Sequence, residues 1–294
     1  MFVQAIQNVS DFTRAIHTIS RNIDSPHIET SSATLFFVNK DGWALTCKHI
    51  VDQFVLTAAV LEKRQRFLAE LEADNSGKNP NRLRKKLMKA YGYPKKPLYE
   101  IYNCFMGCVE GNLEIEYFMH PEIDLALIHF VHYSDLLCDT FPVFAEDGNS
   151  LLQGKYLCKL GYPFPEFTNY RLNTETDSIE WTEIGRIESP RFPLEGMVTR
   201  LLIDDDREVF GFEMSTPGLR GQSGGPVFDR DGKIWGMQYA TRYFDLNFDI
   251  EENLNRNGKM VKVREHEFLY VGNCIHVDAI KDFMRSHNVE FAEG

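Results

Sequence analysis

Ser223 lies in the segment GQSGGP (residues 221–226), which has the residue types that nucleophilic chemistry needs. A serine hydroxyl attacks poorly until a base removes its proton, and the oxyanion that forms at the attacked carbonyl must be bound by hydrogen-bond donors. Glycines beside the serine let the backbone turn so that successive N–H groups point into one small pocket. The alternative is a glycine-rich entry into a hairpin, in which the serine is incidental.

Two further segments supply a candidate base and a candidate carboxylate. His49 lies in the run LTCKHIV (residues 45–51), where it is expected at the end of an apolar strand that anchors its imidazole at the edge of a cleft. Asp124 opens the apolar strand candidate DLALIHF. Taken singly, His49 is better explained as a surface or core histidine, and Asp124 equally well caps a turn. Taken together, the three residues follow the order His, Asp, Ser, with spacings of 75 and 99 residues.

The three segments resemble the signature segments of the chymotrypsin/trypsin-like serine peptidase family, in its bacterial-type form without a PDZ domain. TCKHIV resembles the family's Thr-Ala-x-His segment, DLALI its Asp-Leu-Ala-Leu segment and GQSGGPVF its Gly-x-Ser-Gly-Gly-Pro segment, in the family's order. The resemblance implies a serine endopeptidase for protein or peptide substrates. Ser223 would attack the carbonyl, His49 would accept and return the proton, and Asp124 would hold His49. The N–H groups of Gly221 and Ser223 would form the oxyanion hole, and no metal or other cofactor is implied.

Two positions depart from the secreted digestive members of that family. Ile50 stands where they have a cysteine, and Gln222 stands where they have an aspartate that receives a freed amino terminus. We therefore expect regulation by a partner or by loop ordering in place of amino-terminal insertion. The expected substrate pocket has Pro217 at the position of the acidic base in trypsin, with Gln238 and Tyr239 on one wall. This neutral set predicts a neutral, medium-sized residue before the scissile bond.

The resemblance implies a mainly β fold of two packed antiparallel β-barrels. The first barrel would carry the histidine and the aspartate, and the second barrel the serine. β-rich runs around Asp41-Gly42 and Asp231-Gly232 independently predict hairpins, because glycine tolerates the positive φ of such turns. We expect a single peptidase domain over residues 1–294, with a first barrel over approximately 25–140, a second barrel over 141–275 and a closing helix over 276–287.

Three segments interrupt the β pattern. Residues 10–23 place apolar side chains at i, i+4, i+7 and i+11, which predicts an N-terminal amphipathic helix. Residues 61–96 predict a helical hairpin inserted into the first barrel, with Asn79-Pro80 as a helix start. Residues 242–267 are polar and are expected to form a long irregular loop.

The charge of the chain is unevenly distributed. The whole sequence carries a net charge of −11, which argues against a surface built for nucleic acid. Residues 61–96 contain 11 Lys and Arg against 4 Asp and Glu, so this insertion carries +7. An acidic regulatory partner is therefore the expected ligand of the insertion, and nucleic acid is the less favoured one. The alternative is a solvated helical hairpin that shields the cleft.

The remaining composition predicts a cytoplasmic protein. Six cysteines are scattered without a CxxC pair or a metal-ligand spacing, which predicts reduced thiols. The first residues lack the pattern of a secretory signal, and no apolar run reaches the roughly 18–20 residues that span a bilayer. Two alternatives to an active peptidase stay open. One is a catalytically silent binding module with a protease fold, and the other is an esterase or another acyl-transfer enzyme.

Overall fold

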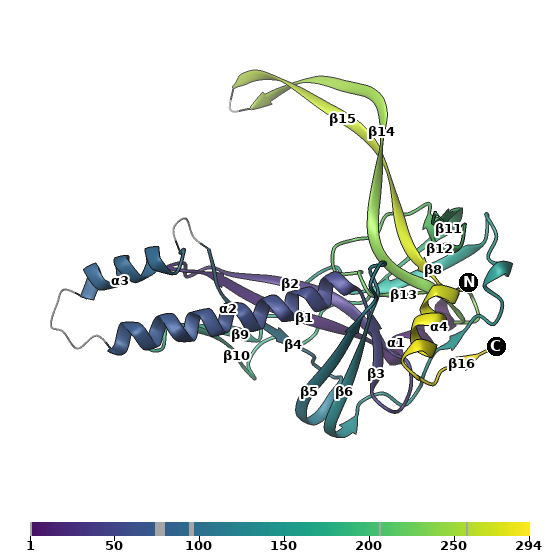
Figure 1. Ribbon diagram of the computed structural model, residues 1–294. Coiled ribbons are helices and arrows are strands. Elements are labelled where there is room, and N and C mark those ends of the chain that lie inside the picture. The colour runs from purple at the N-terminus through teal and green to yellow at the C-terminus, as the bar shows by residue number, and fades with distance from the viewer. Residues whose placement is uncertain (1, 74–79, 94–96, 206, 257) are drawn as a thin grey trace.

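The computed structural model describes residues 2–73, 80–93, 97–205, 207–256 and 258–294. Two β-sheets make up most of this part of the chain, and the helices lie at their edges (Figure 1). The mainly β class expected from the sequence is therefore confirmed. The α-helices of the described residues are α1 (Val3–Phe12), α2 (Lys48–Ala73), α3 (Pro80–Ala90) and α4 (Val277–Ser286).

The first sheet has six antiparallel strands in the order β4-β1-β2-β3-β6-β5. Its edge strands β4 and β5 do not pair with each other in the described part of the chain, so the sheet is a curled half-barrel. Its strands are β1 (Thr13–Asn22), β2 (Ile28–Phe37), β3 (Trp43–Thr46), β4 (Leu98–Cys104), β5 (Val109–Met119) and β6 (Ala126–Leu136).

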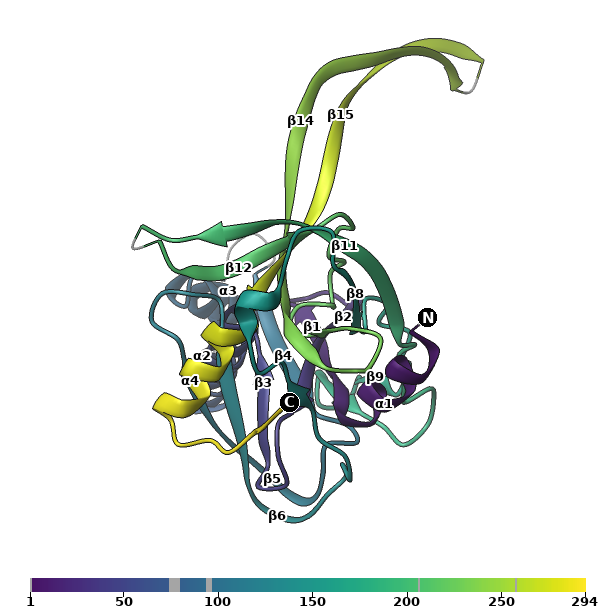
Figure 2. The same cartoon turned by 90° about the vertical axis from the view of Figure 1, so that its right-hand side faces the viewer.

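The second sheet closes on itself. Six of its strands run in the order β13-β8-β11-β12-β15-β14, and β14 pairs again with β13 to complete a ring (Figure 2). The two-barrel arrangement is thus confirmed, with the first barrel open. The ring strands are β8 (Tyr156–Gly161), β11 (Phe192–Ile203), β12 (Val209–Met214), β13 (Pro226–Phe228), β14 (Ile234–Arg256) and β15 (Lys259–His276). The short strands β7 (Val143–Phe144) and β16 (Ala292–Glu293) extend this sheet beyond β14, whereas β9 (Tyr170–Asn173) and β10 (Ser178–Trp181) form a separate two-stranded sheet.

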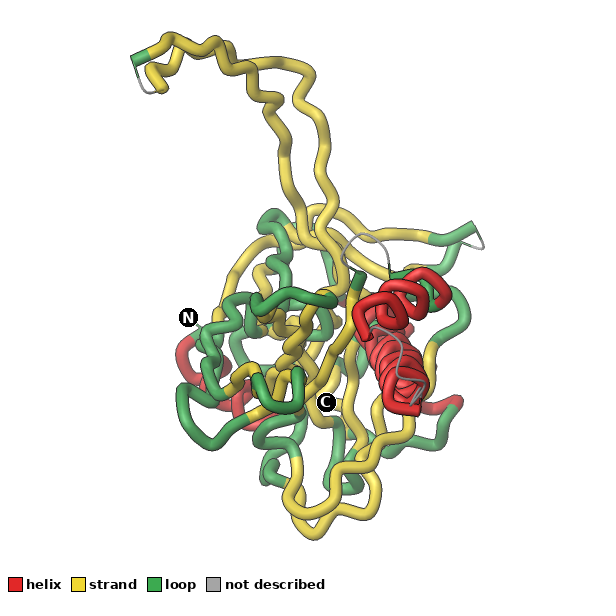
Figure 3. The backbone as a smooth tube through the Cα atoms, turned by 90° about the vertical axis from the view of Figure 1, so that its left-hand side faces the viewer, coloured by secondary structure: helices red, strands yellow, loops and turns green. Residues whose placement is uncertain are grey.

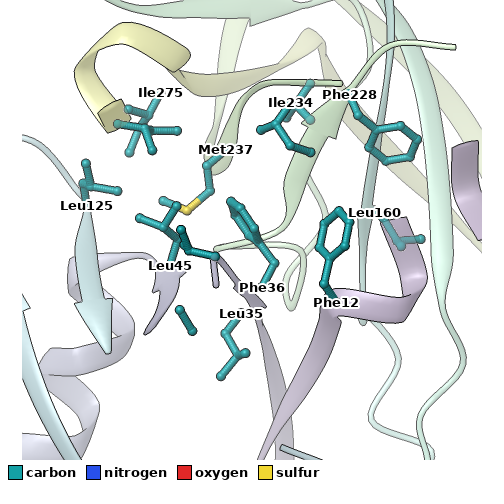
Figure 4. Packing of buried hydrophobic residues seen from close by; sticks show 14 of the residues in the cluster. Phe12, Leu35, Phe36, Leu45, Leu125, Leu160, Phe228, Ile234, Met237 and Ile275 are labelled. Carbon is teal, nitrogen blue, oxygen red and sulfur yellow. The ribbon is translucent and has the colours of Figure 1, made fainter. Parts of the chain in front are cut away.

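The hydrophobic core lies between the two sheets. Phe36 and Leu45 of the first sheet and Ile234 and Met237 of the second are completely buried. Figure 4 shows these side chains converging on one another. Burial of each contributes about 1.5–3 kcal/mol. This shared core fixes the orientation of the sheets, and so it fixes the loops that meet at their junction.

The helix predicted over residues 10–23 is wrong for most of its length. Helix α1 ends within this range, and β1 continues the chain as a strand that pairs with β2 and β4. Both faces of β1 are covered, since Ile16 packs in the main core and Ile19 in a separate cluster. Apolar residues of a strand buried on both faces need not alternate, and β-branched residues favour strands. The first sheet therefore starts well before the boundary expected near residue 25.

The helical hairpin predicted over residues 61–96 is present and longer than expected. Helix α2 already begins soon after β3 ends, and α2 and α3 lie next to each other, on the side of the strands away from the N-terminal helix (Figure 3). Arg64 of α2 forms an ion pair with the buried Glu100 at 2.8 Å, and Arg84 of α3 forms one with Asp24. Part of the positive charge of the insertion is therefore neutralised by the body of the protein.

Residues 242–256 and 259–267 form the two strands of a ribbon, so the irregular loop expected over 242–267 is wrong. Strands β14 and β15 stay paired from Gly236 and His276 out to Arg256 and Lys259, and the ribbon stands clear of the sheets (Figure 1). The side chains in the distal part of the ribbon are exposed to solvent, which is why the segment has the polar composition that is typical of a loop. The sequence nevertheless contained the strand signal, because apolar and polar residues alternate there. The alternating apolar residues are Phe244, Leu246, Phe248 and Ile250.

The cysteines, the last two helices and the absence of a membrane-spanning helix among the described residues can also be compared with the expectations from the sequence. All six cysteines are free, and five of them are buried. Helix α3 starts at Pro80 as expected, while Asn79 lies outside the described residues. Helix α4 matches the expected closing helix. No helix in the described ranges is both long enough and apolar enough to cross a membrane.

Strand β1 also buries a histidine. The ring of His17 stacks on Phe167 with the centroids 4.1 Å apart, and its Nε2 shares a 2.9 Å hydrogen bond with the Ser189 hydroxyl. Burial lowers the pKa of His17 to about 4. The folded protein therefore holds this imidazole in its neutral form.

The low pKa of His17 predicts acid sensitivity. Because the pKa of His17 in the folded protein is depressed below its ordinary value of 6.5, the contribution of His17 to stability is present above pH 6.5 and is lost as the pH falls toward about 4. The shift corresponds to about 3 kcal/mol. We predict that His17→Phe, which keeps the ring stacking, removes this part of the pH dependence of the unfolding free energy. Denaturant titrations across this pH range measure it, with the exposed His27→Phe as control. An unchanged slope in His17→Phe would contradict the prediction.

Candidate active site

The first turn of α2 holds His49 against Asp124. Pairing of β3 with β6 places Asp124, which lies just before β6, beside the start of α2. Asp124 Oδ2 lies 2.6 Å from His49 Nδ1, and Asp124 Oδ1 accepts a 2.9 Å hydrogen bond from the backbone N–H of His49. That N–H is one of the free donors at a helix start, where the helix dipole also favours a carboxylate. Asp124 therefore fixes both the ring and the backbone of His49.

His49 does not lie at the end of a strand, as the sequence predicted. Strand β3 ends at Thr46, and the carbonyl of Cys47 accepts hydrogen bonds from the N–H groups of Ile50 and Val51 at 3.1 and 3.4 Å. These bonds start α2, so His49 belongs to its first turn. The apolar residues that suggested a continuing strand are the buried side of this turn.

The Ser223 loop, between β12 and β13, is bound to the first sheet through Thr34 of β2. The N–H of Thr34 donates to the Ser223 carbonyl at 3.0 Å, and its Oγ1 donates to the Gly221 carbonyl at 2.7 Å. Gly224 has a φ of +85°, and a Cβ there would lie 2.0 Å from the Thr34 carbonyl oxygen. Only glycine allows this close approach. The loop that carries the serine is thereby fixed to the sheet that positions His49.

The N–H groups of Gly221 and Ser223 have no hydrogen-bond partner within the described residues, so both are available to an oxyanion. Gln222 lies between them and is completely buried. Its Oε1 accepts a hydrogen bond from Leu219 N–H, and its Nε2 donates to the Phe192 carbonyl, both at 3.0 Å. A neutral amide therefore holds this loop at the position where digestive peptidases have a carboxylate.

A cleft of about 210 Å³ is lined by His49, Gly221 and Ser223. The His49 side chain is 43% exposed and that of Asp124 26%, so the imidazole is accessible from the cleft. Ser223 Oγ donates to the Tyr239 carbonyl at 3.4 Å, and no hydrogen bond joins it to His49 in the part of the chain described. A bond of that length is weak. Rotation about the Cα–Cβ bond of the serine is enough to release the hydroxyl from it.

The three predicted pocket residues lie together beside the Ser223 loop. The N–H of Gln238 donates to Gly225 O, its carbonyl accepts from Gly224 N–H, and its side chain is buried. A Cβ at Gly218, next to Pro217, would lie 2.3 Å from Gln238 Nε2, so the amide fills the space left by that glycine. Tyr239 follows Gln238 on β14 and presents its carbonyl to the serine.

Lys159 on β8 is a residue of this region that the sequence interpretation missed. Its side chain is completely buried, and its Nζ donates to Thr216 O at 2.8 Å and to Gln238 Oε1 at 3.1 Å. Burial lowers the pKa of Lys159 to about 8. The signal available in the sequence was a single charged residue within the otherwise apolar strand YLCKLG.

Cys47 also lies close to the His49–Asp124 pair. Its Sγ and one ligand atom from each of the other two residues lie within 4.8 Å of one another. Burial raises the pKa of the Cys47 thiol well above its usual value, and the charge of Asp124 raises it further. The thiolate is the form that binds metals, and this environment opposes it. The thiol instead contacts the Gln238 carbonyl at 3.5 Å.

We predict that the hydroxyl of Thr34 stabilises the junction. Thr34→Val keeps the side-chain shape but leaves the Gly221 carbonyl and the N–H of Tyr162, which donates to Thr34 Oγ1 at 3.2 Å, without this partner. Each such loss costs about 1–3 kcal/mol. Chemical denaturation should give a correspondingly lower unfolding free energy for Thr34→Val and a smaller change for Thr34→Ser, which keeps the hydroxyl. Equal stability of Thr34→Val and the wild type would exclude this role.

Comparison with known proteins gives a family for this architecture. A solved HtrA-type protease with a tripeptide is similar to the chain, with 12% sequence identity and a TM-score of 0.49; the match covers 97% of this chain and 63% of that one. No curated protein matches the sequence. The family model for the trypsin-like peptidase domain matches residues 33–237, which include Thr34, His49, Asp124 and the loop of Ser223. The chain belongs to the trypsin-like peptidase family.

Proposed function

We propose that the protein is a serine endopeptidase that cleaves peptide bonds through His49, Asp124 and Ser223 and an acyl-enzyme intermediate. The observation that carries this proposal is the double contact of Asp124 with the ring and the backbone of His49. A carboxylate at Nδ1 keeps the proton on that nitrogen and leaves Nε2 as the base. The cleft that His49 shares with Ser223 supports the same assignment.

In the proposed reaction, Ser223 Oγ rotates away from Tyr239 O and attacks the scissile carbonyl carbon while His49 Nε2 takes its proton. The carbonyl oxygen becomes an oxyanion that accepts hydrogen bonds from the N–H groups of Gly221 and Ser223. His49 then protonates the leaving amine, and the C–N bond breaks to give the acyl-enzyme. Water, deprotonated by His49, hydrolyses this ester and regenerates the serine. Removal of one oxyanion donor typically costs about 2.7–4 kcal/mol in such enzymes.

One observation favours a second candidate, a binding module without turnover. Ser223 Oγ is hydrogen-bonded to Tyr239 O and not to His49. Catalytic hydrogen bonds are often formed only once substrate is bound, so this geometry is also compatible with an active enzyme. A chemical probe of the serine distinguishes the two candidates.

We further propose that an acidic partner regulates the peptidase through the helical hairpin of α2 and α3. Arg82, Lys85 and Lys86 on α3 are exposed. Their positive charge favours an acidic surface. The free cysteines support a reducing compartment, in agreement with a cytoplasmic location.

The first prediction concerns the nucleophile. A fluorophosphonate probe should label the wild type and should leave Ser223→Ala unlabelled, because only an activated serine reacts with it. Intact-mass spectrometry measures the added group, and Ser32→Ala, which changes another serine lining the cleft, serves as the matched control. A wild type that stays unlabelled under conditions in which it is folded favours the binding module.

The second prediction concerns the carboxylate. Asp124→Asn keeps the size of the side chain but lets the amide favour the wrong tautomer of His49. Triads of this kind lose about 10⁴-fold in kcat on the same change. We expect a fall of that order in peptide cleavage with little change in KM, as measured in steady-state assays. Asp52→Asn, on α2 near His49, is the control and should leave kcat unchanged.

A further inference from the structure

Lys159 is a buried cation without a carboxylate. Its side chain is 0% exposed, and within the described ranges it forms no ion pair. Two oxygens, Thr216 O and Gln238 Oε1, accept hydrogen bonds from Nζ, whereas an ammonium can donate three. A buried, unpaired charge is costly, so its retention in a strand that is otherwise apolar indicates a use.

The ammonium lies directly behind the residues that face Ser223. Gln238, whose Oε1 it contacts, forms backbone hydrogen bonds to Gly224 and Gly225, the two residues that follow the serine. The next residue on β14, Tyr239, accepts the Ser223 hydroxyl. The side chain of Gln238 therefore lies between the ammonium of Lys159 and the backbone of β14, the strand to which the Ser223 hydroxyl is hydrogen-bonded.

Two glycines, Gly218 and Gly272, border the Gln238 carboxamide and the Lys159 ammonium. A Cβ at Gly272 would lie 2.5 Å from Lys159 Nζ and 2.9 Å from Gln238 Oε1, and a Cβ at Gly218 would lie 2.3 Å from Gln238 Nε2. The space between these glycines is filled by the carboxamide of Gln238 itself. That carboxamide presents an oxygen acceptor to Lys159, as the end of a substrate side chain would.

Two buried polar atoms, Thr216 Oγ1 and Asn273 Oδ1, have no hydrogen-bond partner in the part of the chain that the structure describes. Thr216 provides the carbonyl that Lys159 contacts, and Asn273 follows Gly272 on β15. Buried polar side-chain atoms are normally satisfied. Of the two atoms, only the threonine hydroxyl is a donor, so only the hydroxyl matches a carboxylate that also accepts from the lysine.

We propose that the peptidase selects an acidic residue before the scissile bond, and that the carboxylate of this residue displaces Gln238 Oε1 as the partner of Lys159 Nζ. This inference rests on the proposed function and replaces the neutral preference expected from the sequence. In this proposal the neutral residues Pro217, Gln238 and Tyr239 line the subsite. Its positive charge comes from Lys159 on β8, which is distant from them in the sequence. When no substrate is bound, the carboxamide of Gln238 fills the subsite and accepts the hydrogen bond of Lys159.

The protonation state of Lys159 should make the preference for an acidic residue depend on pH. Burial lowers the pKa of Lys159 to about 8. The titratable groups beside it are the thiols of Cys158 and Cys274, whose own pKa values burial raises to about 12, so both are neutral in this pH range. The lysine is therefore mainly cationic at pH 7 and loses its proton as the pH rises through about 8. The ratio of kcat/KM for a glutamate peptide to that for a glutamine peptide should fall over the same range. Titration of the catalytic groups changes kcat/KM for both peptides by the same factor, so its effect cancels in the ratio.

The experiment uses peptides that differ only in the residue before the cut, namely Glu, Gln, Leu or Lys. We expect the wild type to prefer Glu over Gln by at least about tenfold in kcat/KM at pH 7. Lys159→Met should abolish this preference while fluorophosphonate labelling and cleavage of the Leu peptide persist. Lys159→Arg keeps a cation and should retain more of the preference than Lys159→Met.

A second variant tests the mechanism without removing the lysine. Gln238→Glu supplies an internal carboxylate to Lys159 and should also abolish the preference for Glu. Cleavage of the Leu or Lys peptide in preference to the Glu peptide, or an unchanged Glu/Gln ratio in both Lys159→Met and Gln238→Glu, would overturn the inference and leave the serine peptidase intact. A wild type that takes no label and cleaves none of the peptides would overturn both.

Discussion

Thr34 joins the two halves of the site, and the other features of the cleft depend on it. All its polar groups are used, since its N–H and Oγ1 donate to the Ser223 loop and its carbonyl accepts from Thr46 Oγ1 at 2.8 Å. Thr46 ends the strand that leads into the helix of His49. One buried threonine thus connects the nucleophile loop of the closed barrel to the strand that places the histidine. The core alone sets how the two barrels pack, whereas the hydrogen bonds of Thr34 set how the Ser223 loop lies relative to the start of the helix that carries His49.

The sequence predicted those parts of the fold that depend on local chemistry. The segments around His49, Asp124 and Ser223 carry recognisable residue types, and the structure brings all three residues to one junction. Local reasoning failed where burial comes from distant segments. Strand β1 is covered on both faces, so its apolar spacing resembled a helix, and this environment cannot be inferred from neighbouring residues. The ribbon of β14 and β15 is a different case, because its alternating apolar and polar residues were a local strand signal.

Lys159 illustrates a second limit of sequence reasoning. A charged residue in an apolar strand can be an edge residue that reaches solvent, and only the three-dimensional packing places its Nζ between Thr216 and Gln238. The same holds for Gln222, which could be recognised as a departure from an aspartate but not as an amide that fixes the loop to Phe192. Polar side chains act through long-range partners, and sequence spacing does not specify these.

Helix α2 has a mechanical consequence. Asp124 holds its first turn, and Arg64 ties it to Glu100 on β4. Between these two points the helix is a stiff rod of about 22 Å, and about 14 Å more extend beyond the second point to Ala73. The same helix thus links the base at its first turn to an end that lies beyond the second of these two contacts, and its packing against β4 keeps that link stiff.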